Sequence, residues 1–295
     1  MADAEGHAEV TDLAQAVVNG VLVGAVFALV AVGLTLIYGV MDIINFAHGE
    51  MVMLGMYSSF FAWSLFGLDP LVSLPITGLA ILVVGALMYY GVIGPVLGRS
   101  PLAQIIATFG VQVFLRGLAQ FFWKPDTRTV NGAWAEKIRL PVAGIVIGGP
   151  QLIMALGAVI ATVAVAMFMN RTKTGGAIRA AGEDPAAASL MGIDPKRMYA
   201  LAWLIAGAVT GVAGGLLMNA YSASPTVGVT FVLMAFVVVA LGGFGSIAGA
   251  AVAGLLLGVV QDVVGLYAPS YPLAAALAIY LLVVLLRPQG LLGTR

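Results

Sequence analysis

Residues 198–261 read MYALAWLIAGAVTGVAGGLLMNAYSASPTVGVTFVLMAFVVVALGGFGSIAGAAVAGLLLGVVQ and contain no Asp, Glu, Lys, Arg or His over 64 positions. One bilayer crossing takes roughly 20 apolar residues, so this run is long enough for at least two crossings. The segment just before it, residues 171–197, carries eight charged side chains. This contrast predicts a membrane-embedded body with a charged segment on its cytoplasmic side.

The whole chain has the composition of a membrane protein. Hydrophobic residues make up 61% of the 295 positions and charged residues only 9%, with a mean hydropathy of +1.07. Soluble domains average about 25% charged residues, so a soluble fold of this size would lack polar surface. We therefore expect an all-α, polytopic membrane fold that forms a single transmembrane domain over residues 1–295.

Charged residues divide the chain into eight or nine hydrophobic transmembrane helices, some of them broken or re-entrant. The number depends on residues 231–261, which are too long for one simple crossing and are interrupted by LGGFGS at 241–246. Polar residues 124–139 predict an external loop. The expected spans are residues 13–41, 51–68, 70–98, 102–123, 152–169, 199–218, 231–261 and 273–286.

The orientation follows from the positive-inside rule. Arg and Lys side chains in residues 170–198 place this segment in the cytoplasm, although the loop at 124–139 also carries four basic residues. Nine crossings put the acidic N-terminus outside and the C-terminus inside, whereas eight put one terminus on the opposite side. We therefore prefer nine crossings.

The first polar feature inside the apolar body is YGVMDIINFAHGE, residues 38–50. It lies between two spans and includes Asp42, Asn45, His48 and Glu50. One interpretation is a break in a helix whose polar groups satisfy freed backbone, which membranes tolerate where the break is buried in protein or lines a wet path. Lining of a substrate pathway is the second interpretation, and a metal or proton site is the third.

The second polar feature is a stripe of side chains spaced four residues apart. Such spacing keeps the residues on one slowly rotating face of a helix. They either hydrogen-bond to a neighbouring helix or line a path, and Arg116 needs a partner, for which Glu50 and Asp262 are the candidates. The stripe consists of Gln104, Thr108, Gln112, Arg116 and Gln120. Over both features, the candidate substrate-pathway residues are Tyr38, Asn45, His48, Gln112 and Arg116.

The third feature is the charged segment at 170–198. We expect Gly175-Gly176 and Gly182 to break it, and Asp184 to cap a short helix with Pro185 at its first position. Gly192 would end that helix. A short helix joined by glycines to two spans is either a docking element for a soluble partner or an ordinary polar loop.

This chain lacks the residues that several classes of function require. The net charge is zero and there is no basic patch, so we expect no nucleic-acid partner. No cysteine is present, the two histidines lie far apart, and no lysine follows a glycine, which rules out a G-x-x-x-x-G-K-[ST] phosphate loop. We therefore expect no enzyme activity, no metal and no cofactor in this chain.

Three stretches resemble the LivH-type permeases of bacterial branched-chain amino-acid ABC importers. They are GLTLIYGVMDIINFAHGE at 33–50, RAAGEDPAAASLMGI at 179–193 and ALGGFGSIAG at 240–249. They occur in the family's order and spacing. The resemblance implies a transmembrane permease domain, located in the bacterial inner membrane, that translocates Leu, Ile or Val. Related permeases handle urea, short amides or other amino acids, and an ion-coupled secondary transporter is the alternative from another class.

The resemblance also implies partners and a coupling segment. The partners are a second homologous permease, two ATP-binding cassette subunits that bind ATP and Mg, and a periplasmic amino-acid-binding protein. The stretch at 186–192 resembles the EAA-x-x-x-G coupling motif of importer permeases, with Ala186 in place of the usual Glu. The candidate ATPase-coupling residues are Glu183, Asp184, Ala186, Ala187, Ala188 and Gly192.

Overall fold

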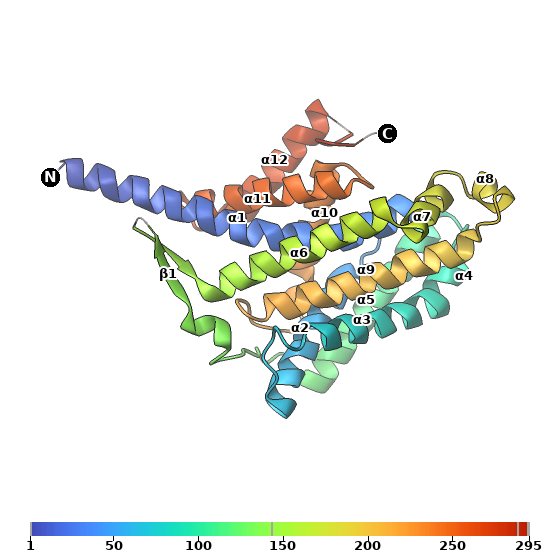
Figure 1. The fold of residues 1–295 in the computed structure, drawn as a ribbon, viewed down its shortest axis with the longest axis horizontal. Coiled ribbons are helices and arrows are strands. Elements are labelled where there is room, and N and C mark those ends of the chain that lie inside the picture. The colour runs from blue at the N-terminus through green and yellow to red at the C-terminus, as the bar shows by residue number, and fades with distance from the viewer. Residues whose placement is uncertain (1, 143, 288, 294–295) are drawn as a thin grey trace.

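The computed structural model describes residues 2–142, 144–287 and 289–293 and consists mainly of long helices that lie side by side (Figure 1). Six described helices are long and apolar enough to cross a membrane: α1 (Ala2–Met41, with the apolar part Val10–Met41), α3 with its continuation to Val96, α5 (Pro101–Trp123), α6 (Gly149–Arg171), α9 (Pro195–Leu217) and α11 (Ile247–Tyr267). The continuation of α3 (Leu74–Met88) comprises the π-helix η1 (Tyr89–Ile93) and α4 (Gly94–Val96).

Two shorter apolar helices bring the candidate spans among the described residues to eight, α10 (Val227–Gly242) and α12 (Pro272–Leu286). Helix α2 (His48–Phe66) is a ninth hydrophobic helix, and its first half is buried among the others. The all-α polytopic fold is therefore confirmed, with a helix number inside the expected range. The long apolar run at 231–261 divides at residues 243–246, between α10 and α11, as its glycines predict.

Helices α1 and α9 form the centre of the bundle. In an apolar stretch of 18 residues taken from each helix, 83% of the residues of α1 and 72% of those of α9 are buried, against only 17% of those of α5. Small residues let the central backbones approach closely. A Cβ added to Gly24 would lie 2.7 Å from the carbonyl oxygen of Gly254, so α1 and α11 touch through their backbones. Gly20 meets Gly258 in the same way, so glycines at four-residue spacing pack α1 against α11.

The two ends of the bundle carry different structures (Figure 1). At the hairpin end, residues after α5 form the short helix η2 (Trp134–Lys137) and an antiparallel pair of strands, β1 (Arg139–Val142) and β2 (Ile145–Gly148). The side chain of Gln15 on α1 both donates to the Val146 carbonyl at 3.1 Å and accepts from the Val146 amide at 2.8 Å. The hairpin was not expected, because the sequence indicated only a polar loop there.

The opposite end, which we call the α8 end, carries α7 (Lys173–Glu183) and α8 (Pro185–Leu190). The expectation that glycines interrupt this segment is wrong for α7, which runs unbroken through Gly175, Gly176 and Gly182. A Cβ on Gly182 would lie 3.0 Å from Cα of Val40, so packing against α1 explains this glycine.

Helices α2 and α10 begin inside the bundle rather than at its surface. After α1 ends, residues 42–47 run back without helical structure, and Nε2 of His48 lies 2.8 Å from the Val30 carbonyl oxygen. Val30 precedes the end of α1 by three helical turns, about 16 Å. Gly49 at the start of α2 touches Gly228 at the start of α10. The break in helical structure that the sequence offered as one interpretation of residues 38–50 is therefore present at 42–47, and it makes this a re-entrant segment.

We predict that Gly24→Ala destabilises the protein by about 1–3 kcal/mol, because the added methyl group meets backbone atoms of α11 that have no room to rotate away. The thermal unfolding midpoint of the detergent-purified protein measures the effect. Gly91→Ala is the matched control, since nothing lies within 4 Å of a Cβ at that position. An equal midpoint for both variants would contradict the close packing of α1 and α11.

Candidate functional site

The re-entrant segment and the polar stripe, which are far apart in the sequence, meet between α2 and α5. The Thr108 hydroxyl donates to the Ile44 carbonyl oxygen at 2.9 Å. Two turns further along α5, the Arg116 guanidinium donates from Nε at 3.1 Å and from Nη2 at 2.5 Å to Oε1 of Glu50. The stripe therefore ties α5 to the point where the chain re-enters the bundle.

The Glu50–Arg116 pair is asymmetric in its exposure. The Glu50 side chain is completely buried, whereas the Arg116 side chain keeps 26% of its surface exposed. Of the two expected partners for Arg116, the structure selects Glu50, while Asp262 lies on α11. Gln112 is also buried beside this pair, and its Oε1 accepts no hydrogen bond within the described part of the chain.

Asn45 and His48 are completely buried and help to shape the break. Oδ1 of Asn45 accepts a hydrogen bond from the Ala47 amide at 3.1 Å, and His48 bonds to the backbone of α1 at Val30. The first contact satisfies a backbone amide that the break leaves without a helical partner, and the second ties the start of α2 to the middle of α1. Within residues 2–142, 144–287 and 289–293, no three His, Cys, Asp or Glu side chains lie close enough to hold a metal ion.

The other members of the stripe and of the pathway set lie elsewhere. The side-chain amide of Gln104 donates to the Arg99 carbonyl, just before α5 begins. Gln120 is exposed. Tyr38 lies at the α8 end, where its ring packs against Phe244 with 4.4 Å between centroids. The structure thus brings Gln112 and Arg116 together with Glu50 and places Tyr38 at a separate site.

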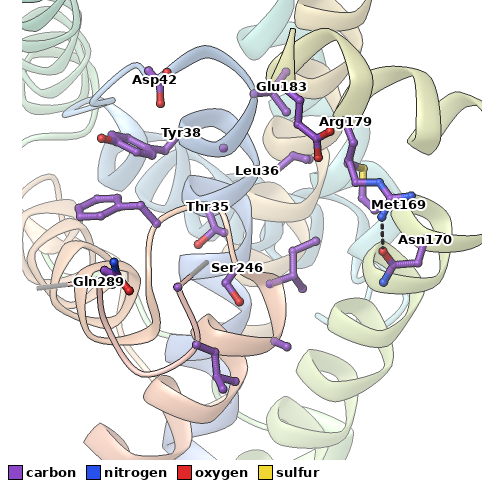
Figure 2. Close-up of a pocket in the computed structure, with 18 residues that line it drawn as sticks. Thr35, Leu36, Tyr38, Asp42, Met169, Asn170, Arg179, Glu183, Ser246 and Gln289 are labelled. Atoms are coloured by element: carbon purple, nitrogen blue, oxygen red, sulfur yellow. Dashed lines mark hydrogen bonds between the residues drawn. The ribbon is translucent and has the colours of Figure 1, made fainter. Parts of the chain in front are cut away.

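That separate site is a cavity of about 680 Å³ at the α8 end (Figure 2). Its walls come from the end of α1, the end of α6, α7, the turn between α10 and α11, and residues 289–293. The three sequence stretches that carry the family resemblance therefore meet here. The Arg179 guanidinium donates to Oδ1 of Asn170 at 2.9 Å, and Glu183 lines the same cavity (Figure 2).

Helix α8 is built as its sequence predicts. Oδ1 of Asp184 accepts from the amides of Ala186 and Ala187 at 2.9 Å each, with Pro185 at the first helical position. Gly192 follows the helix with φ +80°, a left-handed conformation that favours glycine.

Sequence reasoning missed the most exposed apolar side chains of the α8 segment, Leu190 (89% exposed) and Met191 (81%). Ala188 of the same segment is buried. Two adjacent apolar residues in a charged segment outside the long apolar spans were the signal that could have identified them. We call Leu190 and Met191 the apolar tip; both lie outside the candidate spans.

These features define a multi-pass membrane protein with a polar ion pair at mid-span and an exposed apolar tip outside the bundle. A family model described as "Branched-chain amino acid transport system / permease component" matches residues 16–286. The chain therefore belongs to this family and is the permease component of an ABC transport system for branched-chain amino acids. It does not hydrolyse ATP, which the partner ATPase subunits of the system bind.

Two permeases for branched-chain amino acids match the chain over nearly its full length. The high-affinity branched-chain amino acid transport system permease protein BraD of Pseudomonas aeruginosa is 32% identical, with 97% of each chain covered. The corresponding protein LivH of Escherichia coli is 33% identical, with 95% of each chain covered. The ribose import permease protein RbsC of Haemophilus influenzae is 27% identical over 73% of this chain and 68% of its own. No solved structure matches the chain.

We predict that Arg116→Gln destabilises the protein by about 3–5 kcal/mol, because it leaves the buried Glu50 carboxylate without its partner. Adding Glu50→Gln removes that charge, so the double variant should unfold at a higher temperature than Arg116→Gln alone. Thermal unfolding of the purified protein measures both. Arg179→Gln, which loses one exposed hydrogen bond, is the control and should shift the midpoint little. A double variant less stable than Arg116→Gln would contradict the pairing.

Proposed function

We propose that this permease translocates leucine, isoleucine and valine across the bacterial inner membrane as one subunit of an ATP-driven importer. Its partners are a second homologous permease, two ATP-binding cassette subunits and a periplasmic amino-acid-binding protein. Residues 1–295 form one transmembrane permease domain, in which residues 170–198 are the cytoplasmic coupling segment. Membership in the permease family supports the transported class and argues against an ion-coupled secondary transporter.

The observation that carries the proposed pathway is the partial exposure of Arg116 on α5. It is residue 16 of the 23 in this helix, so it lies within the membrane span. A charged residue exposed to lipid at mid-span costs about 2.5–3.5 kcal/mol on insertion scales. The exposed part of the guanidinium therefore faces water or protein rather than lipid, and we place the pathway along this side of α5. Gln112 lies behind Arg116 on the same side.

Asn45 and His48 belong to the same proposal as residues behind the pathway, since they have no exposed surface in this conformation. They hold the re-entrant segment on which Glu50 depends. Tyr38 lines the cavity at the α8 end, where a solute leaving toward the cytoplasm would pass. We therefore assign it to the exit of the pathway.

The coupling proposal rests on the shape of the α8 segment. Asp184 caps the helix, Ala186 and Ala187 leave its surface small, and Gly192 turns the chain toward α9. Leu190 and Met191 project as an apolar tip that a groove on an ATPase subunit would cover. Ala188 and Glu183 link the segment to the bundle, because Ala188 is buried and Glu183 lines the cavity beside α1.

We predict that Leu190→Ser with Met191→Ser abolishes ATP-driven leucine uptake, because the ATPase subunits lose the apolar tip. The measurement is uptake into liposomes that contain the whole importer, with ATP on the ATPase side and binding protein on the other. Ala187→Arg should have the same effect by steric and charge conflict. Copurification of the ATPase subunits gives a second readout.

Val142→Ser is the matched control, since Val142 is also an exposed apolar residue (56%) but lies at the hairpin end. It should leave ATPase copurification unchanged. Normal uptake by the Leu190 and Met191 double variant would contradict docking at α8. Leucine accumulation by the purified chain alone, driven by an ion gradient, would contradict the importer itself.

We predict that Val113→Cys reacts with a charged, membrane-impermeant thiol reagent at least about tenfold faster than Phe114→Cys, because a thiolate forms in water and not in lipid. Val113 is 53% exposed and lies on the Arg116 side of α5, three residues before it, whereas Phe114 is 63% exposed and lies on the far side. The chain has no cysteine, so each variant carries a single thiol. Equal rates would contradict a pathway on the Arg116 side.

A further inference from the structure

The Arg116 guanidinium has hydrogen-bond donors that its ion pair does not use. Arginine carries five N–H donors in a rigid plane. Two of them, one on Nε and one on Nη2, are directed to the single oxygen Oε1 of Glu50. No other hydrogen bond from Arg116 is found in the described ranges of the chain, and 26% of the side chain is exposed. Three of the five donors therefore have no partner among the described residues.

Glu50 holds this guanidinium in one orientation. Its side chain is completely buried, and Gly49 beside it is in contact with Gly228 of α10, so the carboxylate has little freedom to move. A planar guanidinium with one edge held in place presents its other edge to a second planar anion, and carboxylates match that geometry with two parallel hydrogen bonds. A lysine would offer only a point charge.

Two acceptor atoms near the ion pair also have no well-formed partner. Oε2 of Glu50, which is adjacent to the Gln112 side chain, and Oε1 of Gln112 accept no well-formed hydrogen bond in the described structure. Buried acceptors of this kind normally have partners. An ammonium group could supply the missing donors, but both acceptors are buried in this structure, so it would reach them only after α5 moved away from α2. Around the exposed edge of Arg116, the α5 side chains Phe109 (54% exposed) and Val113 are apolar.

We propose that Arg116 binds the α-carboxylate of the amino acid during its passage, with Glu50 as the positioning residue that orients the guanidinium. This inference rests on the proposed pathway along α5. The free edge of Arg116 recognises the carboxylate, the acceptors of Glu50 and Gln112 receive the ammonium group, and the apolar surface at Phe109 and Val113 contacts the side chain. The ligand class is a zwitterionic α-amino acid with an apolar side chain, so neutral amides and urea are poor ligands.

The test uses the Val113→Cys permease in the complete membrane complex with its ATPase and second permease subunits, without binding protein. A charged thiol reagent modifies the cysteine, and the concentration of ligand that halves the rate is measured. Leucine and 4-methylpentanoate, which both carry a carboxylate, should protect the thiol. The half-protecting concentration of leucinamide, which lacks the carboxylate, should be at least about tenfold higher than that of leucine, since charge-assisted hydrogen bonds are the stronger class.

Variants separate recognition from folding. Arg116→Gln combined with Glu50→Gln leaves no buried charge unpaired and should raise the half-protecting concentration of leucine at least about tenfold, a factor that corresponds to 1.4 kcal/mol. Arg116→Lys should give an intermediate value. Gln104→Ala changes the same helix near its start and is the control. It should give the same half-protecting concentration of leucine as the Val113→Cys parent.

Equal protection by leucine and leucinamide, or protection that survives Arg116→Gln with Glu50→Gln, would overturn carboxylate recognition and leave the pathway intact. Absence of protection by any of the ligands would also overturn it. A Val113→Cys thiol that does not react at all would overturn the pathway along α5 itself, and with it this inference.

Discussion

A carboxylate buried inside a membrane bundle persists only where a cation and hydrogen-bond donors replace the water it has lost. Glu50 meets this condition through Arg116, and the requirement shapes the region around it. It helps to hold α5, which is otherwise poorly covered, to the bundle, together with the Thr108 hydrogen bond and the stacked rings of Trp123 and Tyr57. It also explains how an unwound segment at 42–47 persists below the surface, since Thr108 of α5 bonds to its backbone. The pair thus links the re-entrant segment to the least buried helix.

The bundle divides into a tightly packed centre and a more loosely held periphery. In the centre, Gly24 and Gly254 bring the backbones of α1 and α11 into contact, and Gly211 of α9 packs against the Thr77 carbonyl of α3. Backbone contacts of this kind leave little space for helices to slide, because a packed interior has few alternative arrangements. Helix α5 and the α7–α8 segment lack such contacts over most of their surfaces. Conformational change is therefore easier for these peripheral elements than for the centre.

The sequence predicted those parts of the fold that follow from local chemistry. Asp184 and Pro185 define the start of α8 because capping involves only neighbouring residues. The long apolar runs predict spans because every helix in lipid must satisfy its own backbone. The continuity of α7 through Gly182 could not be predicted, since it depends on contact with Val40 of α1. For the same reason the sequence left two partners open for Arg116, because only tertiary packing distinguishes Glu50 from Asp262.

A continuous route of bonded and packed backbone connects the α8 end to Arg116. Helix α8 follows α7 through the Asp184 cap, and α7 rests on α1 where Gly182 contacts Val40. The end of α1 leads directly into residues 42–47, which are bonded to α5 at Thr108 and precede Glu50. If α8 docks an ATPase subunit as proposed, this route would link a displacement of α8 to the Glu50–Arg116 pair through the end of α1 and residues 42–47. Because only the Arg116 side of the pair is exposed, a shift of α2 against α5 would act first on the guanidinium.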